Sequence, residues 1–291
     1  MRGRTGAWLV QGVNQRTYVA KWAQPGSVRG LISEMYAGTL LSHLQIRTPP
    51  ITILDVTDGV LLERSDYLRI RGIADRARLH PGCHYGSLVE PDLERQAVYD
   101  ILPTALYRTL DNRMDFVATL LVDKLLNNRD YRQAVFYRQQ RGRRQLVAEM
   151  IDHGMCLGGD DWVFEDAPLW GIHVNPAAYD EVLGWSQLEP LLEEIRELPP
   201  ALLESVRERV PAEWLLIEGG LAGSELDRVA DLIMARRTKV RSLIQAVLDL
   251  PDQTIFRNWG CASPIEYPIK KDCTRAAANP GRLSASSGAG D

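Results

Sequence analysis

The chain has 291 residues and carries 34 Lys and Arg against 38 Asp and Glu, a formal net charge of −4 at pH 7. Hydrophobic residues make up 45% and charged residues 25%, which excludes a disordered chain. No run of about 18 apolar residues occurs, so we expect no membrane span and no signal peptide. Four scattered cysteines and slight acidity favour a cytoplasmic protein without disulfides and argue against direct nucleic-acid binding.

The first elements are predicted to form a small strand–helix–strand unit. Apolar and polar residues roughly alternate over 17–22, which favours a strand, and a Pro-Gly loop follows. Apolar positions at helical spacing predict a helix over about 31–44. Two prolines stop that helix, and ITILDV at 51–56 predicts another strand. We expect the stretch that follows, through 82–91, to be rich in loops.

The middle of the chain is predicted to be helical. From Leu93 the pattern is helical again, and a long apolar helix is expected over 114–126. Asp111 or Asn112 can cap its N-terminus, because both side chains accept hydrogen bonds from free backbone N–H groups. Asn127-Asn128 suits its end or a tight turn.

A hairpin and further helices are expected after this helix. Strand-like runs at 133–138 and 145–152 flank a Gly-containing turn. From Leu188 to about Leu250 the chain is predicted to be mostly helical, with breaks at prolines and glycines and a final helix over about 225–248. Residues 251–291 lose apolar periodicity, and we expect them to form a disordered tail. These elements predict an α+β protein with a helical C-terminal half.

Lys21 in YVAKW lies on the first predicted strand, and Glu34 follows on the predicted helix. A strand lysine can hold phosphate oxygens, and a helix carboxylate paired with it keeps the ammonium aimed, as in protein kinases. Taken alone, the two are more simply a surface lysine and a solvated glutamate. Whether the pair marks a phosphate-binding site therefore depends on the residues that follow in the chain.

Two aspartates flank the predicted hairpin. Asp130 in NNRD can orient an attacking hydroxyl and accept its proton. Asp152 in MIDHG leaves a buried strand and can bind a divalent metal that carries nucleotide phosphates. Each is by itself an ordinary turn residue, but the hairpin would return both carboxylates to one edge of the domain. Together with the lysine and the glutamate, they favour a phosphoryl-transfer site.

The runs VAKW, LISEMYAGTLL, TPP, HYGS, NNRDYRQAVF and MIDHGMC, in this order, resemble the HipA-like kinase family, a bacterial branch distantly related to protein kinases. The resemblance covers roughly residues 5–245. It implies a two-lobed protein-kinase-like fold within 1–250, with a small β-rich N-lobe over about 1–90 and a larger, mostly helical C-lobe over about 91–250.

The resemblance also implies ATP and Mg²⁺ as cofactors. The γ-phosphate of ATP would pass to an unknown hydroxyl of a protein or a small molecule. By resemblance, Lys21 contacts phosphate and Glu34 is its partner, Asp130 matches the catalytic-loop aspartate, and Asp152 matches the metal-binding aspartate.

Two features depart from the family pattern. The family has a metal-binding asparagine five residues after its catalytic aspartate, where this chain has Val135, which offers no oxygen. Gln133 or Asn128 can supply an oxygen instead, and we count Gln133 with the cofactor-binding residues and Asn128 with the metal ligands. The glycine-rich phosphate loop is also incomplete, with only Gly3, Gly6 and Gly12 before the lysine. A catalytically weak or inactive nucleotide-binding module with a regulatory role is therefore the alternative.

Other side chains favour simpler interpretations. His80, Cys83, His84 and His153 lack the spacing of a zinc site, and nothing marks an orienting acid for a Cys-His hydrolase built on Cys156 and His153. The arginines between Arg129 and Arg144 can attract a phosphorylated substrate, but such a run is more often a solvated turn. The aromatics after Asp152 are expected to pack in the core: Trp162, Phe164, Trp170 and Trp185.

Overall fold

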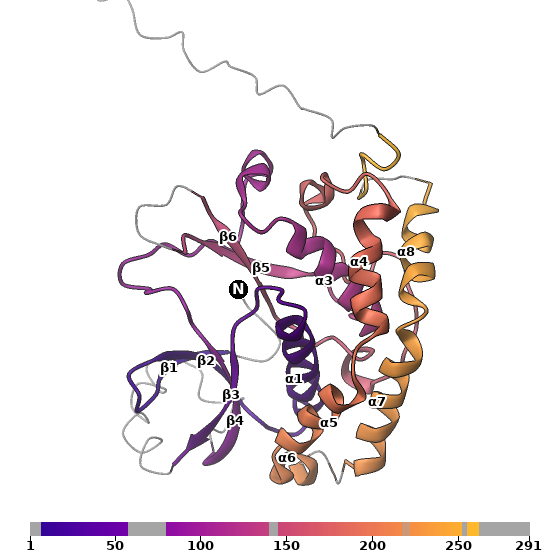
Figure 1. The fold of residues 1–291 in the computed structure, drawn as a ribbon. Coiled ribbons are helices and arrows are strands. Elements are labelled where there is room, and N and C mark those ends of the chain that lie inside the picture. Colours follow the sequence, from indigo (N-terminus) through magenta and orange to yellow (C-terminus); the bar gives the residue numbers. More distant parts are fainter. Residues whose placement is uncertain are drawn as a thin grey trace, which may run out of the picture.

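The computed structural model describes residues 7–57, 80–139, 145–217, 219, 221–251 and 255–261. Its first lobe is a four-stranded antiparallel sheet with one helix, drawn at the indigo end of the chain in Figure 1. The sheet order is β1-β2-β4-β3. The elements are β1 (Trp8–Gln11), β2 (Thr17–Lys21), α1 (Val28–His43), β3 (Ile51–Val56) and β4 (Gly82–Leu88).

The second lobe is mostly helical and includes a two-stranded hairpin. Its elements are η1 (Thr104–Thr109), α3 (Met114–Leu125), β5 (Gln133–Tyr137), β6 (Val147–Ile151), η2 (Gly159–Asp161), η3 (Pro176–Tyr179), α4 (Trp185–Arg196), α5 (Pro200–Arg209), α6 (Ala212–Ile217), α7 (Gly223–Arg236) and α8 (Val240–Leu248). Figure 1 shows α1 between the sheet and the helices of this lobe. The predicted α+β class, with a small β-rich lobe and a larger helical one, is confirmed.

The hydrophobic core is continuous between the lobes because α1 and α3 are apolar on most sides. Nearly every apolar side chain of α3 is buried, and α1 buries residues around most of its circumference. Such all-round burial is typical of helices enclosed by other elements. Helix α1 therefore has a fixed position between the sheet and helices α3, α5 and α6, with which it is in contact.

Most predicted elements are confirmed within a few residues. Strands β2 and β3, helices α1 and α3, the β5–β6 hairpin and the interrupted helices after Leu188 all occur where the patterns place them. The turn at Gly142 lies outside the described residues, and the lobe boundary near residue 90 stays a prediction. No helix of the described ranges is long and apolar enough to cross a bilayer.

The prediction of a loop-rich stretch at 82–91 is wrong, since β4 pairs with both β2 and β3 at the centre of the sheet. Two glycines and a histidine interrupt the alternation of apolar and polar residues that would predict a strand there. Gly86 is needed there, because a Cβ at this position would lie 2.6 Å from Cγ of Leu54. A neighbouring strand, not an alternating sequence, thus determines this element.

Two further helix predictions are wrong. No helix begins at Leu93, and the segment instead makes a bridge in which Tyr99 and Phe136 exchange backbone hydrogen bonds of 2.9 and 2.8 Å. The final helix is broken between α7 and α8, where the Arg237 guanidinium donates to carbonyls at the end of α4. Asn112 does not cap α3 with its side chain; its amide pairs with the backbone of Ala148 on β6.

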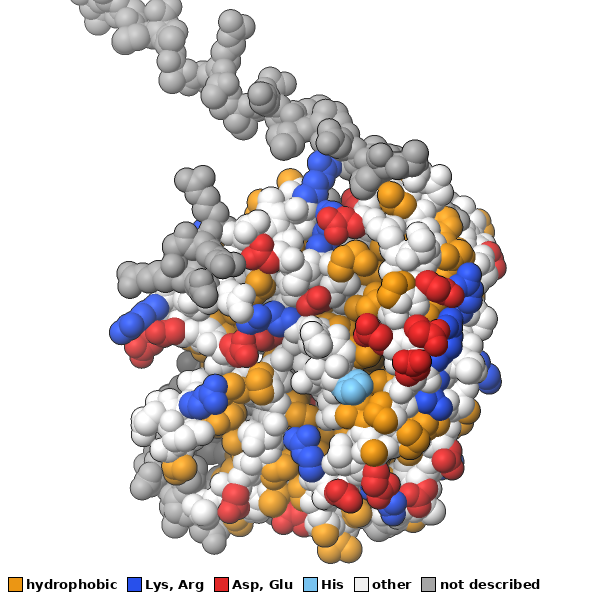
Figure 2. All heavy atoms as spheres, viewed as in Figure 1, with side chains coloured by type: hydrophobic (Ala, Val, Ile, Leu, Met, Phe, Trp, Pro, Cys, Tyr) orange, Lys and Arg blue, Asp and Glu red, His pale blue; other side chains and the backbone are white. Residues whose placement is uncertain are grey.

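Part of the predicted tail belongs to the fold. Ile255 and Phe256 are buried and join the core, and Asn258 donates from its side chain to the carbonyl of Asp180 over 2.7 Å. The rest of the tail, from residue 262, lies outside the described residues. The surface drawn in Figure 2 carries acidic and basic side chains side by side. An exposed ion pair joins α8 to α4, between Arg241 and Glu189 at 2.5 Å.

Candidate active site

Lys21, Glu34 and Asp152 form one cluster at the junction of the lobes. Lys21 is the last residue of β2, and its ammonium donates to Oε1 of Glu34 on α1 and, over 2.8 Å, to Oδ1 of Asp152 just after β6. The side chains of the lysine and the glutamate are 11% and 3% exposed, whereas that of Asp152 is 36% exposed. The cation is therefore enclosed, while one of its two carboxylates reaches solvent.

The electrostatics of the cluster favour a charged lysine. Burial by itself lowers the pKa of Lys21, but the carboxylates of Glu34 and Asp152 outweigh it and the net pKa is raised. Tyr85, paired with Lys21 in the sheet, has a pKa raised well above its usual value by burial and by the same two carboxylates. The site thus holds a permanent cation beside a neutral phenol.

The Asp152 turn packs closely against α1. Asp152 has a left-handed backbone with φ 58°, which aims the chain toward the helix. A Cβ on Gly154 would lie 3.6 Å from Oε1 of Glu34, and Ser33 Oγ donates to the carbonyl of Cys156 over 3.0 Å. These contacts fix the end of β6 and the turn after it against α1.

Asp130 lies in the loop that follows α3. Asn127, with φ 50°, ends that helix, and the backbone N–H of Asp130 donates to Oδ1 of Asn128 over 3.1 Å. The Asp130 side chain accepts from the backbone N–H of Tyr131 over 2.7 Å, and its carbonyl accepts from Gly171 over 3.0 Å. The half-buried carboxylate is fixed by its own loop.

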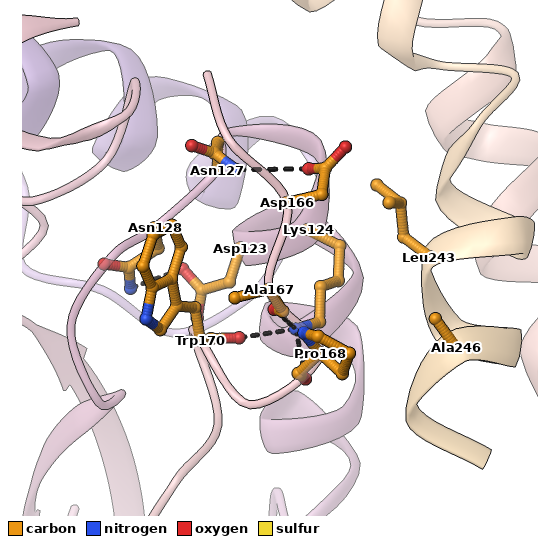
Figure 3. A pocket seen from close by; sticks show the side chains of 10 residues that line it. All are labelled: Asp123, Lys124, Asn127, Asn128, Asp166, Ala167, Pro168, Trp170, Leu243 and Ala246. Atoms are coloured by element: carbon orange, nitrogen blue, oxygen red, sulfur yellow. Dashed lines mark hydrogen bonds between the residues drawn. The ribbon is translucent and has the colours of Figure 1, made fainter. Parts of the chain in front are cut away.

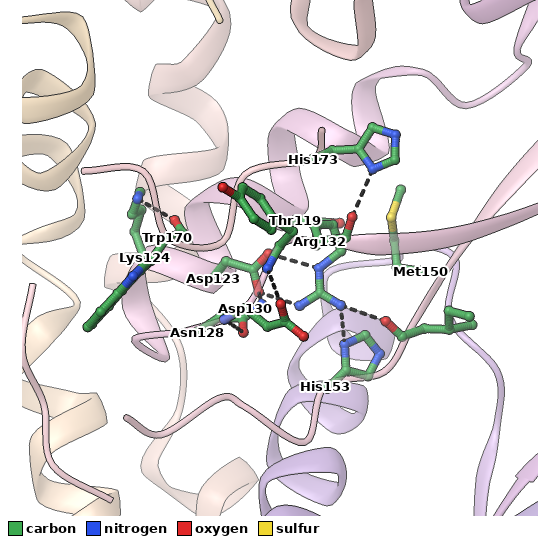
Figure 4. A network of polar contacts seen from close by, with 12 residues as sticks. Thr119, Asp123, Lys124, Asn128, Asp130, Arg132, Met150, His153, Trp170 and His173 are labelled. Carbon is green, nitrogen blue, oxygen red and sulfur yellow. Dashed lines mark hydrogen bonds and ion pairs between the residues drawn. The ribbon is translucent and has the colours of Figure 1, made fainter. Parts of the chain in front are cut away.

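Backbone and side-chain bonds join this loop to the Asp152 turn. Arg129 donates from its N–H to the carbonyl of Met155 over 3.0 Å. The Arg132 guanidinium donates to the carbonyl of Ile151 over 2.9 Å and to Nδ1 of His153 over 2.7 Å (Figure 4). The hairpin therefore brings the two aspartate-bearing segments together, and their contact runs through neighbouring residues.

The other sequence candidates lie beside these segments. Gln133 begins β5 opposite Ile151, one residue from Asp152. Asn128 is 2% exposed and uses both ends of its amide inside the loop, donating to Oδ1 of Asp123 over 3.0 Å. Val135 pairs with Glu149 on β6. Burial raises the pKa of Glu149 to about 7, partly offset by a hydrogen bond from Tyr137.

Arg132 and Asp123 are residues that the sequence interpretation missed. The arginine was expected in a solvated basic run, and that expectation is wrong for Arg132, which is 2% exposed. Its partner Asp123 lies on α3, where a carboxylate among apolar residues was the available signal. Arg129 also departs from a solvated turn, since it pairs with Glu165 at 2.9 Å and lies over the ring of Trp170. Arg141, Arg143 and Arg144 lie outside the described residues.

The alternative sites gain no support. Among the described residues no group of three His, Cys, Asp or Glu side chains is placed to bind a metal. His84 uses both ring nitrogens on backbone groups, Nδ1 accepting from Ala23 and Nε2 lying 2.8 Å from the carbonyl of His80. Cys156 is fully buried, and burial raises the pKa of its thiol well above the usual value, which suits an inert core cysteine.

A small pocket of about 120 Å³ lies behind the Asp130 loop, between the loop, residues 166–170 and α8 (Figure 3). Lys124 lines it, and its ammonium donates to the carbonyls of Ala167, Pro168 and Trp170. Burial lowers the pKa of Lys124 to about 8. All three ammonium protons are thus used in holding residues 167–170, and this lysine is structural.

No family model and no curated protein matches the chain. Among solved structures it is similar to a crystal structure of the Golgi casein kinase, at 14% identity and a TM-score of 0.47, over 88% of this chain and 74% of the other. A crystal structure of the Golgi casein kinase with Mn/ADP bound is similar at 13% identity and a TM-score of 0.46, over 86% and 72%. At these values the likeness says nothing about activity, so side-chain roles rest on this chain's own geometry.

Proposed function

We propose that the chain is a kinase-like phosphotransferase that transfers the γ-phosphate of ATP to a hydroxyl acceptor. The observation that carries the proposal is the Lys21 cluster, in which a buried ammonium is held between Glu34 and a partly exposed Asp152. A permanent cation at a lobe junction suits phosphate oxygens, because a fixed charge stabilises phosphoryl transfer without reorganisation.

Each residue has a role that its surroundings support. Lys21 contacts phosphate, and Glu34 keeps the ammonium aimed because its carboxylate is buried against it. Asp130 orients the acceptor hydroxyl and takes its proton, for which a half-buried carboxylate held by its own loop is suited. Gln133, at the start of β5, lies next to the Asp152 turn and contacts the nucleotide.

The residues present fit a metal that arrives with its nucleotide. Mg²⁺ is usually bound by one or two carboxylates together with phosphate oxygens, and Asp152 offers a carboxylate that is 36% exposed. Asn128 stays a predicted metal ligand; because it is buried and its amide oxygen accepts the Asp130 N–H, we also give it a positioning role. A divalent ion held there by Asp152 would supply positive charge against the phosphate oxygens.

A nucleotide-binding module without transfer activity is the second candidate. Val135 favours this candidate, because it stands where the family has a metal-binding asparagine and its side chain has no oxygen. In the structure Val135 pairs with Glu149 on β6. The HipA-like kinases are the family we propose, on the strength of the VAKW, NNRD and MIDHG motifs. The acceptor is a protein or small-molecule hydroxyl.

The experiment is incubation of the full chain with γ-labelled ATP and Mg²⁺, and in parallel Mn²⁺, followed by detection of phosphoprotein and free phosphate. Asp130→Asn removes the proton acceptor and Lys21→Met removes the phosphate contact. Lys239→Met, at an exposed lysine, is the matched control. We expect transfer by the wild type and the control and its loss in both site variants.

The outcomes separate the two candidates. An inert wild type whose melting temperature rises with ATP, and loses that rise in Lys21→Met, identifies the binding module. If the wild type shows no phosphate transfer and its melting temperature does not change with ATP, both candidates are overturned.

A further inference from the structure

A buried polar network joins the Asp130 loop to the residue after Asp152, and it runs through Asn128, Asp123, Arg132 and His153, all labelled in Figure 4. At its centre the Arg132 guanidinium donates from Nε to Oδ2 of Asp123 over 2.9 Å and from Nη2 to Oδ1 over 2.5 Å. The two side chains are 1% and 2% exposed. Two parallel hydrogen bonds of this kind fix the orientation of the guanidinium relative to the carboxylate as well as their distance. Arg132 also donates from Nη1 to Ile151 and His153, so helix α3 and the end of β6 are joined through one guanidinium.

The direction of each hydrogen bond in the network follows from chemistry. A guanidinium only donates, so Nδ1 of His153 accepts from Arg132. The ring therefore carries its N–H at Nε2, which donates to Oγ1 of Thr48 over 3.1 Å. The Thr48 hydroxyl then donates to the carbonyl of Met150 over 3.0 Å. This order gives every donor of the chain an acceptor.

The network ends at the two aspartates. At one end, Asp123 accepts from the amide of Asn128, whose oxygen accepts from the backbone N–H of Asp130. At the other, His153 directly follows Asp152, whose left-handed backbone sets the course of the turn. Thr48 belongs to the segment between α1 and β3, so the chain of bonds also reaches the first lobe. The Asp130 loop is thus hydrogen-bonded directly to the network, and Asp152 is joined to it through its peptide bond to His153.

We propose that five residues act as positioning residues that fix the separation of Asp130 and Asp152: Thr48, His153, Arg132, Asp123 and Asn128. This inference rests on the proposed phosphotransferase function. A buried ion pair is weak evidence for stability, because apolar residues of equal volume often serve as well. Fixed placement of two reacting groups is a use that apolar packing does not replace, since a displacement of about 1 Å can cost on the order of 100-fold in rate.

The test uses Thr48, which is half-buried at the margin of the network, so its variants are expected to fold. Thr48→Val keeps the shape and removes the hydroxyl, whereas Thr48→Ser keeps the hydroxyl. Thr109→Val is the control, since this exposed hydroxyl donates to a backbone carbonyl elsewhere. We expect kcat to fall about 10-fold or more in Thr48→Val, with KM for ATP nearly unchanged and most activity retained by Thr48→Ser.

His153 gives the second pair of variants. Glutamine can accept from Arg132 and donate toward Thr48, as the imidazole does, whereas leucine can do neither. His153→Leu should therefore lower kcat and His153→Gln should recover part of the loss. A wild-type kcat in both Thr48→Val and His153→Leu overturns the inference, as does an equal loss in the conservative variants.

A wild type that transfers no phosphate contradicts the proposed function, and the positioning role is then read from amide hydrogen exchange. Thr48→Val should speed exchange in both 127–132 and 151–155, and Thr48→Ser and Thr109→Val in neither. Unchanged exchange at 127–132 in Thr48→Val overturns the positioning role by itself.

Discussion

Two clusters in this molecule hold a buried cation against carboxylates of other segments, and they differ in access to solvent. Arg132 and Asp123 are closed, with side chains 1% and 2% exposed. Lys21 is almost as buried, but its partner Asp152 is 36% exposed. A closed pair cannot exchange partners, whereas an open one can accept a phosphate or a metal ion beside its own carboxylate. Solvent access, not the presence of a buried charge, thus separates the proposed phosphate site from the closed ion pair.

The largest expected effect is on the closed cluster. Arg132→Met leaves Asp123 as an unpaired buried carboxylate, so we expect a loss of about 3–5 kcal/mol in the free energy of unfolding. Urea denaturation of the variant and the wild type measures it. Adding Asp123→Leu to Arg132→Met should restore part of that loss, because it removes the orphaned charge. A loss below about 1 kcal/mol would show that the pair is hydrated in solution.

Glu149 is an intermediate case, since it is buried but its nearest cation contact, to Nε of Arg47, is 4.0 Å long. Because the pKa is about 7 in the folded chain and the ordinary value is 4.5, the protonated form stabilises the fold below pH 4.5. That stabilisation is lost as pH rises through 7, by up to about 1.4 kcal/mol per pH unit.

Glu149→Gln cannot ionise and keeps an acceptor for the Tyr137 hydroxyl. Its unfolding free energy relative to the wild type should therefore grow between pH 5 and 7 and level off above. Chemical denaturation at three pH values measures this difference, and a pH-independent difference contradicts the buried charge.

The open cluster should respond less to loss of one partner. Glu34→Gln removes one carboxylate from the Lys21 ammonium but leaves Asp152 in place, so we expect a loss of about 2 kcal/mol in the free energy of unfolding. Nucleotide binding should weaken as well, because the ammonium is no longer aimed. Thermal melting with and without ATP tests both effects. Stability equal to that of the wild type would mean that Asp152 alone holds the lysine.

The smallest effect is expected at the surface. Glu189→Gln removes the partner of Arg241 and Arg196, whose ion pairs with it are exposed. Such pairs contribute about 0–1 kcal/mol, and salt screens them. The variant should melt within a few degrees of the wild type, with any difference vanishing in about 1 M salt. A large drop in melting temperature that salt does not remove would contradict this prediction and would show that Glu189 contributes more to the packing of α4 on α8 than an exposed ion pair does.

Local patterns were enough to predict the elements that carry Lys21, Glu34 and Asp152. Lys21 and Glu34 stand on a strand and a helix with clear periodicity, and the hairpin fixes where β6 ends and therefore where Asp152 lies. The burial of Arg132 could not be predicted in this way, since it depends on Asp123, nine residues earlier on another element. Charge patterning treats an arginine run as solvated, and only tertiary packing separates the buried Arg132 from the exposed Arg138 among the described members of the run.

Strand β4 was missed for a related reason. Its residues obtain their strand conformation from neighbours on both sides, and Gly86 is selected by the nearness of Leu54 and not by any strand propensity. The roles of all six site residues stay predictions, because a fold can place such side chains without showing what they bind: Lys21, Glu34, Asn128, Asp130, Gln133 and Asp152.

The left-handed backbone at Asp152, with φ 58°, affects how this position can be dissected. An alanine there would lose the carboxylate and also bear a backbone penalty of roughly 1–2 kcal/mol that aspartate and asparagine relieve through local hydrogen bonds. An alanine scan would therefore overstate what the charge contributes to folding. Asparagine isolates the charge. Glycine and alanine both lose the carboxylate, so the difference between Asp152→Gly and Asp152→Ala isolates the backbone strain.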